Sequence, residues 1–185
     1  MSECLDSITE KNERMVIKML QIHLRNLKSK DAPLMLEWMQ DLSIACFFRF
    51  DASSMTAEDC ERFISSTDSE INSKHYAIVN DEDEYLGTIS LKNIDKQKRE
   101  AEYAISTRKK AHGTGAAMSA TKEILRIAFE ELGLERVYLN VLAENTRANA
   151  FYKKVGFQFD YCEKNAVEIN GEKKDLNWFF LKGAV

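Results

Sequence analysis

Two glycines one residue apart mark the part of this chain best suited to hold an anion, the stretch KKAHGTGAAMSA (Lys109–Ala120). Gly113 and Gly115 carry no side chain, so a ligand can approach the backbone closely at this point. A helical pattern begins beside them, and the start of a helix presents unpaired N–H groups and a partial positive charge. Three basic residues lie on the approach: Arg108, Lys109 and Lys110. This combination predicts a phosphate-binding turn.

An ordinary strand-to-helix turn with solvated basic side chains is the alternative interpretation, because a Gly-x-Gly pattern before a helix is a weak signal by itself. Two better-known phosphate motifs are excluded by the residues that follow. No Gly-Lys-Ser or Gly-Lys-Thr completes a P-loop, and the third glycine of the dinucleotide-binding fingerprint is missing.

A second stretch with chemical potential is NTRANAFYKKVGF (Asn145–Phe157). Asn145 occupies the N-cap position of a predicted helix, and Gly156 follows the end of that helix. Tyr152 carries a hydroxyl that can donate a proton. The alternative role for Tyr152 is that of a half-buried aromatic ring that anchors the helix.

Interleaved strands and helices must position these residues. Apolar runs predict strands at residues 22–27, 75–79, 85–94, 100–107, 136–142, 157–169 and 173–181. Helical spacing and caps predict helices at residues 31–41, 56–66, 114–132 and 145–155. The acidic turn at residues 80–84 and the dipeptide Asn170-Gly171 predict hairpins, which interrupt a purely parallel pattern. We therefore predict a mixed α/β fold, in which a mixed sheet has helices on both faces.

Helix ends are also specified by the sequence. Asp31 is expected to cap the first helix. Thr56 and Asp59 are expected to form a capping box at the start of the second helix, and Gly133 to close the third.

Composition limits the class of protein. The chain has 185 residues, with 26 basic and 30 acidic side chains and a net charge of −4, so no global positive charge points to nucleic acid. Its four cysteines form no CxxC pair, which favours buried or idle thiols in a reducing compartment. The N-terminal residues resemble no signal peptide, and no apolar stretch is long enough to span a membrane. We expect a cytoplasmic protein with an N-terminal extension at residues 1–18 and one domain at residues 19–185.

The two stretches together resemble the GNAT superfamily of acetyl-CoA-dependent N-acetyltransferases. The pyrophosphate signature of that superfamily, Gln/Arg-x-x-Gly-x-Gly/Ala, is similar to Lys110–Ala116, with lysine replacing its first residue. Its later motif, an asparagine before a helix that ends in Tyr-x-x-x-Gly-Phe, is similar to Asn145–Phe157. The likeness extends over residues 22–181. It implies a predominantly antiparallel mixed sheet of about seven strands, with helices on both faces and a splayed central strand pair.

By this resemblance, acetyl-CoA is the co-substrate and lies where strands 100–107 and 136–142 separate. Its pyrophosphate is expected on the backbone amides of residues 112–116, and Asn145 is expected to bind the pantetheine arm or to act only as a helix cap. A backbone N–H near Ile105 could stabilise the developing oxyanion. The expected cofactor-binding residues are Ile105, Lys110, His112, Gly113, Thr114, Gly115, Ala116, Asn145 and Tyr152. No metal is implied.

Acetyl transfer to an amine requires two proton movements. The amine, with a pKa near ~10.4 as an alkyl ammonium, must lose a proton, and the departing thiolate must gain one. Tyr152 is the predicted acid for the thiolate. Glu102 is the candidate base, with a solvated strand carboxylate as the alternative. His112 is expected to contribute its backbone to the phosphate turn rather than to act as a base.

The acceptor is expected to be a small-molecule primary amine, such as an amino sugar or a polyamine. LEWMQD (Leu36–Asp41) and strands 85–95 and 101–105 resemble the branch with ribosomal-protein alanine, spermidine and amino-sugar acetyltransferases. Acidic side chains at Glu37, Asp41 and Glu102 could attract a cation, or simply form a solvated acidic surface. A protein N-terminal acetyltransferase and a non-catalytic acyl-CoA-binding module stay open as alternatives. A homodimer is common among relatives, and neither nucleic acid nor a membrane is an expected partner.

Overall fold

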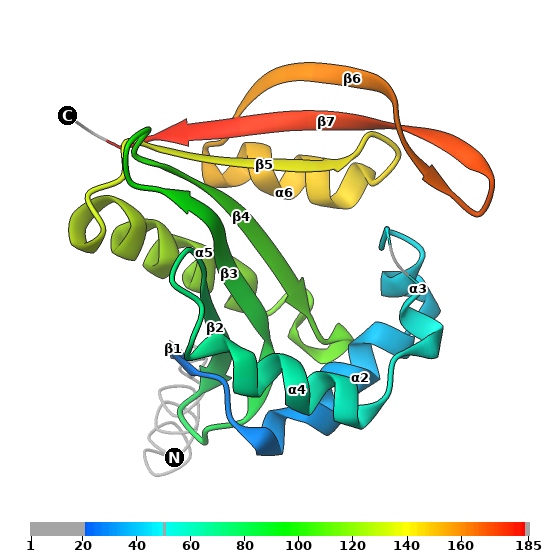
Figure 1. The fold of residues 1–185 in the computed structure, drawn as a ribbon, viewed down its shortest axis with the longest axis vertical. Helices are drawn as coiled ribbons and strands as arrows, with labels where there is room; N and C mark the ends of the chain where they lie inside the picture. The colour runs from blue at the N-terminus through cyan, green and yellow to red at the C-terminus, as the bar shows by residue number, and fades with distance from the viewer. Residues whose placement is uncertain (1–20, 50, 184–185) are drawn as a thin grey trace, which may run out of the picture.

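The computed structural model describes residues 21–49 and 51–183, which form a mixed α/β fold around one seven-stranded sheet (Figure 1). The strands are β1 (Ile22–Asn26), β2 (Lys74–Asn80), β3 (Tyr85–Asp95), β4 (Glu100–Thr107), β5 (Arg136–Leu142), β6 (Gln158–Ile169) and β7 (Glu172–Lys182). Their order in the sheet is β1-β2-β3-β4-β5-β7-β6. The helices are α2 (Ala32–Gln40), α3 (Leu42–Ala45), α4 (Ala57–Thr67), α5 (Ala116–Arg126) and α6 (Thr146–Val155). The predicted extension at residues 1–18 lies outside the described residues.

The pairing of β4 with β5 divides the sheet. All other neighbouring strands pair antiparallel, whereas β4 and β5 run parallel and pair at three positions, from Glu100 with Arg136 to Glu102 with Tyr138. Beyond these positions β4 continues to Thr107 and β5 to Leu142 without pairing to each other. The predicted mostly antiparallel sheet with a splayed central pair is therefore confirmed.

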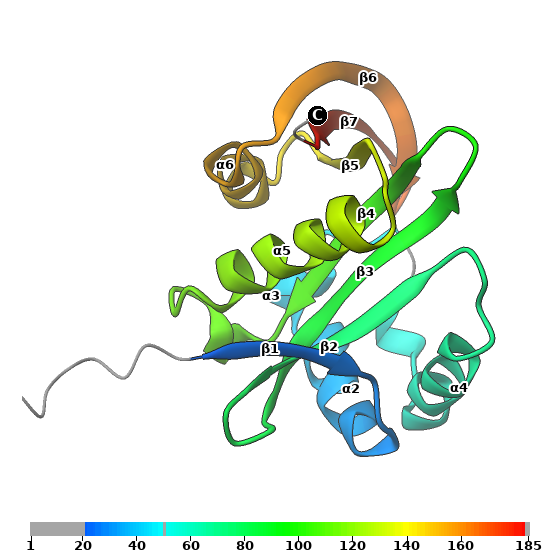
Figure 2. The same ribbon diagram turned by 90° about the vertical axis from the view of Figure 1, so that its left-hand side faces the viewer.

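Helices cover both faces of the sheet, as predicted. Figure 2 shows α5 on one face of β1–β4, with α2 and α4 on the other. Alternation along β2 explains the two cores: Ile78 packs in the core beside α5, while Ala77 and Val79 pack in the core with α2 and α4. Within residues 21–49 and 51–183, no helix has the length and apolarity needed to cross a membrane.

Helix α5 begins two residues later than predicted. The predicted start, Thr114, lies before the helix, and its hydroxyl accepts a hydrogen bond from the N–H of Ala116 at 3.2 Å. A π-helical segment, Ile127–Glu131, continues α5, and Gly133 then adopts a left-handed φ of 64°. The predicted closing glycine is therefore confirmed.

The predicted caps have different outcomes. Thr56 and Asp59 form the expected capping box at α4. Asp31 occupies the predicted N-cap position of α2, but the prediction that its side chain caps the helix is wrong, because it makes no cap hydrogen bond. Asp31 is only 1% exposed and accepts hydrogen bonds from both terminal guanidinium nitrogens of Arg25, at 2.7 and 2.9 Å, and from the Lys28 N–H at 2.9 Å. A buried carboxylate needs a fixed charged partner, and Arg25 on β1 supplies it.

Replacing Asp31 by alanine should therefore lower the free energy of unfolding by about 3 kcal/mol, because Arg25 would lose its buried partner and keep only the more exposed Asp83. Chemical denaturation measures this change. The matched control is Asp81→Ala, which breaks an exposed pair with His23 and should cost less than about 1 kcal/mol. Equal losses in the two variants would contradict a special role for the buried pair.

Candidate active site

The glycine turn between β4 and α5 is open toward solvent. Gly113 and Gly115 adopt left-handed φ values of 79° and 87°, and a Cβ placed on either would meet no atom within 4 Å. Glycine takes this conformation without steric cost, whereas other residues do so only with strain. The turn thus combines a glycine-dependent backbone with empty space around it, as a bound anion requires.

Only some of the predicted amides are available to an anion. The His112 N–H donates to the Lys109 carbonyl at 3.0 Å, and the Thr114 N–H points to the Ala111 carbonyl at 3.4 Å. Among the described residues, the N–H groups of Gly113, Gly115, Ala117 and Met118 have no acceptor. The free amides therefore extend two residues further along the chain than predicted, to Met118, because the helix starts at Ala116.

The basic residues before the turn are mostly neutralised by acidic partners. Arg108 donates to both carboxylate oxygens of Glu37, at 3.0 and 2.6 Å, and to the Tyr85 carbonyl. Lys110 pairs with Glu84, and this hydrogen bond lowers the pKa of the Glu84 carboxyl. Lys109 is exposed and makes no ion pair with the described residues. The positive field at the turn consequently comes from Lys109 and the start of α5.

Arg147, in the first turn of α6, adds a cation that sequence reasoning missed. Its Nη1 lies 2.9 Å from Nδ1 of His112, so α6 contacts the glycine turn directly. Because a guanidinium only donates, His112 must accept through Nδ1 and is neutral in this contact. Burial and the nearby Arg147 charge both lower the pKa of His112.

The contact predicts a pH dependence. Protonation of His112 removes the lone pair that Arg147 uses, so the contact is present at neutral pH and is lost as pH falls through the lowered pKa. In Arg147→Ala we expect the His112 pKa to move upward, because the Arg147 charge that lowers it is gone, while burial and Lys109 still lower it. An NMR titration of the imidazole checks this, and an unchanged midpoint would contradict the contact.

Two asparagines fix the start of α6 beside the end of β5. Asn145 accepts a hydrogen bond from the Ala148 N–H at 3.1 Å, which confirms its predicted position as the helix cap. The buried Asn149 donates to the carbonyls of Leu142 and Asn145 and accepts from Asn177 on β7. Asn149 was missed in the sequence, where its only signal was a polar residue on the inner face of the helix.

Tyr152 lies beneath the point where β4 and β5 separate. Its ring centroid is 6.0 Å from that of Tyr103 on β4 and 6.2 Å from that of Phe179 on β7. The side chain is 8% exposed, and burial raises its pKa to about 12. Its hydroxyl has no hydrogen-bond partner among the described residues, yet it is not sealed from solvent. Such a phenol is protonated at neutral pH and available to a ligand.

Glu102 and Ile105 lie on opposite faces of β4. Ile105 packs against the core beside α5, and Tyr152 of α6 belongs to the same core. Glu102 points to the face covered by α2 and α4, where Lys92 Nζ and Asn93 Nδ2 donate to its two oxygens at 3.0 and 2.9 Å. The structure therefore does not bring Glu102 and Tyr152 together; they lie on the two faces of the splayed pair.

The other predicted acidic residues are also occupied. Glu37 binds Arg108, and Asp41 accepts hydrogen bonds from Ser43 that lower its pKa. In the described part of the chain, no three His, Cys, Asp or Glu side chains gather as a metal site.

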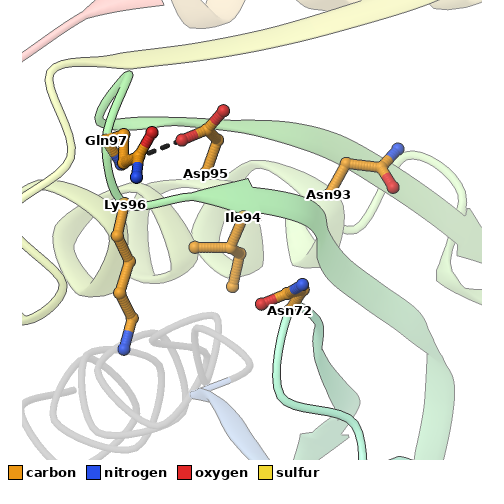
Figure 3. A pocket seen from close by; sticks show the side chains of 6 residues that line it. All are labelled: Asn72, Asn93, Ile94, Asp95, Lys96 and Gln97. Atoms are coloured by element: carbon orange, nitrogen blue, oxygen red, sulfur yellow. Dashed lines mark hydrogen bonds between the residues drawn. The ribbon is translucent and has the colours of Figure 1, made fainter.

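A hollow of about 500 Å³ on the described surface lies elsewhere (Figure 3). It is lined by Asn72, Asn93, Ile94, Asp95, Lys96 and Gln97. These residues surround the β3–β4 turn, at the end of β4 opposite the glycine turn. We therefore do not assign the site to this hollow.

The glycine turn, the splayed strands and the tyrosine on α6 define a known class of protein. The family model described as an acetyltransferase (GNAT) domain matches residues 21–158. The chain belongs to the GNAT acetyltransferase family, as its two sequence motifs predicted.

Individual relatives support this family membership. The chain is 32% identical over 95 residues to a putative ribosomal N-acetyltransferase of Bacillus subtilis. It is 31% identical over 98 residues to spermidine N(1)-acetyltransferase of Escherichia coli. These alignments cover 51% and 53% of this chain and 52% and 53% of the relatives. The chain thus spans about half the length of the curated relatives it matches.

Solved structures share the fold. Spermidine N-acetyltransferase from Vibrio cholerae, in complex with CoA and spermine, superposes with a TM-score of 0.80 at 21% identity, over 88% of this chain and 95% of that chain. A structure described as a probable acetyltransferase gives a TM-score of 0.76 at 27% identity, over 87% and 92% of the two chains.

Proposed function

We propose that this protein is an N-acetyltransferase that moves the acetyl group of acetyl-CoA to a primary amine by direct attack. The observation that carries the proposal is the Tyr152 hydroxyl, on a buried ring beneath the strand separation, which has no hydrogen-bond partner in the described part of the chain. A thiolate leaving group needs a proton at this place, and a phenol with a pKa of about 12 retains its proton until then.

The remaining residues fit the co-substrate. The free amides of Gly113, Gly115 and Ala117 offer donors for the pyrophosphate, with Lys109 and Arg147 as nearby cations. Between Tyr103 and Thr107, no described strand pairs with β4 on its β5 side, so its backbone can pair with the pantetheine amides. When bound, acetyl-CoA supplies an acetyl thioester for transfer. The roles of Ile105, Lys110, His112, Thr114, Ala116 and Asn145 stay predictions.

The amine should approach from the opposite face of β4, where Glu102 lies. The role of Glu102 as the base stays a prediction, because a proton taken there must displace Lys92 or Asn93 from the carboxylate. We favour a small cationic acceptor, a polyamine before an amino sugar, because spermidine acetyltransferases are among the relatives in both sequence and fold.

Release of CoA thiol from acetyl-CoA tests the proposal. The panel comprises spermidine, several amino sugars, an aminoglycoside and a peptide that begins with alanine. Turnover with a small amine supports the proposal and identifies the acceptor class. Preference for the peptide would favour the ribosomal-protein type, in line with the Bacillus relative.

Two other outcomes bear on the remaining alternatives. Acetyl-CoA binding with no turnover on any amine would favour a non-catalytic acyl-CoA-binding module. Absence of acetyl-CoA binding would overturn the proposal entirely. A cytoplasmic location, a homodimer and a domain spanning residues 19–185 stay predictions.

A further inference from the structure

Three polar side chains outside the site described so far form a hydrogen-bonded line from β3 through β2 to the segment before β2. Ser90 on β3 lies with its Oγ 2.8 Å from Nδ1 of His75 on β2. The other ring nitrogen of His75, Nε2, lies 3.0 Å from a carboxylate oxygen of Glu70, in the segment before β2. Both nitrogens of the imidazole are thus used, one toward a hydroxyl and one toward a carboxylate.

Burial changes along this line. Ser90 is 5% exposed, the His75 side chain is 6% exposed, and the Glu70 side chain is 37% exposed. The line therefore begins inside the protein and ends at the surface. Phe63 of α4 packs edge-on against the imidazole, with ring centroids 5.0 Å apart. Among the described residues, Glu70 is the charged group that contacts the imidazole. The hydrogen bond from His75 lowers the Glu70 pKa, so this end of the line is an anion at neutral pH.

The inner end of the line lies beside the proposed acceptor face. Ser90 is directly opposite Ala104 of β4 in the antiparallel ladder, and Lys92, two residues further along β3, binds Glu102. Side chains at directly opposite positions have Cβ atoms about 4.5–5.5 Å apart. Ala104 is partly exposed and carries only a methyl group, so Ser90 is separated from the acceptor side by little more than that group.

We propose that Ser90, His75 and Glu70 form a proton relay that carries the proton of the acceptor ammonium to the surface. The inference rests on the proposed function, since it concerns the proton that must leave before the amine attacks. It gives that proton a route that does not require breaking the contacts of Glu102 with Lys92 and Asn93. Neither His75 nor Ser90 contacts the amine directly. Each acts through its neighbour in the line, so both are positioning residues.

The nitrogen of the ammonium loses two protons on becoming an amide. One leaves before the attack and is released to solvent. The other leaves the nitrogen after the attack and replaces the proton that Tyr152 gives to the thiolate, so one proton is released overall. Ser90 Oγ receives the ammonium proton through one water and passes its own proton to Nδ1 of His75. The resulting imidazolium gives its Nε2 proton to Glu70, which releases it to solvent. Exchange between the two neutral imidazole tautomers, through the same carboxylate, restores the starting state.

Steady-state kinetics between pH 6.5 and 10 test the relay on the full chain. His75→Asn retains an acceptor for Ser90 but cannot take up a proton, and Ser90→Ala breaks the line. For both variants we expect kcat at pH 7.5 to fall about 100-fold, with acceptor KM near the parent value. The deficit should shrink toward pH 10, where an amine with a pKa near ~10.4 loses its proton unaided.

Two variants separate the relay from simple destabilisation. Ser90→Thr keeps the hydroxyl and should retain most of the turnover. Thr88→Val removes another buried hydroxyl on the same face of β3, bonded to Tyr85 at 2.6 Å, and should show no pH-dependent deficit. Parent-like turnover in His75→Asn, or a deficit equal at every pH, would overturn the relay alone. Lack of turnover in the parent chain would overturn the proposed function and the relay together.

Discussion

In the Tyr152→Phe variant, kcat for acetyl transfer should fall about 100-fold while the affinity for acetyl-CoA stays near the parent value. The hydroxyl is the only atom removed, and it has no hydrogen-bond partner among the described residues, so the fold loses little. Because burial raises the Tyr152 pKa to about 12, the phenol stays protonated up to pH 10. Ionisation of Tyr152 should therefore not lower the turnover of the parent enzyme up to pH 10.

Tyr103→Phe is the matched control for this prediction. Tyr103 is also buried, lies against the same ring, and its hydroxyl is 2.7 Å from the Thr121 hydroxyl. Removing that hydrogen bond should cost about 1 kcal/mol of stability and leave turnover near the parent value. Stopped assays of thiol release and calorimetric titration with acetyl-CoA measure both variants. Parent-like turnover in Tyr152→Phe would remove Tyr152 as the acid.

A carboxylate at the glycine turn should abolish tight binding of acetyl-CoA. In Gly115→Glu we expect the Kd to rise at least about 100-fold, because a like charge at an anion site costs several kcal/mol. The left-handed φ of 87° adds strain of roughly 1–2 kcal/mol to any non-glycine residue. Calorimetric titration gives the Kd, and thermal unfolding reports the strain separately.

Strain and charge can be separated with two further variants. Gly171→Glu places the same side chain at a φ of 79°, also in open space, but in the β6–β7 turn. It should reproduce the loss of stability without affecting the Kd. Gly115→Gln keeps the bulk and removes the charge, so its Kd should lie between those of the parent and Gly115→Glu. Parent-like affinity in Gly115→Glu would show that the turn is not the cofactor site.

Much of the backbone could be predicted because local patterns agree with the tertiary structure. The strands at residues 100–107 and 136–142 have the predicted bounds, since each is an apolar run between clear turn signals. The Asn170-Gly171 turn has the two left-handed residues that its sequence requires. The start of α5 differed because the Thr114 hydroxyl binds the backbone before the helix begins.

Side-chain partners could not be read from the sequence, because they join residues far apart in the chain. Arg108 pairs with Glu37, and Arg147 contacts His112, across 71 and 35 positions. The line from Glu70 to Ser90 depends on the register of β2 with β3, in which His75 lies opposite Ser90. The Glu102 side chain likewise points away from Tyr152 because of the strand pairing, which its place in a motif does not reveal.

Among residues 21–49 and 51–183, the short parallel ladder between β4 and β5 leaves the sheet with four open edges instead of two. Two of these are the outer edges of β1 and β6, and two lie in the middle of the sheet, where β4 and β5 face each other unpaired. Central strands normally hold the slowest-exchanging amides of a domain. Here the amides of residues 103–107 that point toward β5 should exchange with solvent like those of a peripheral strand. Any extended chain that reaches the opening also finds free donors and acceptors there, so a ligand that fills it protects the protein against unwanted strand addition.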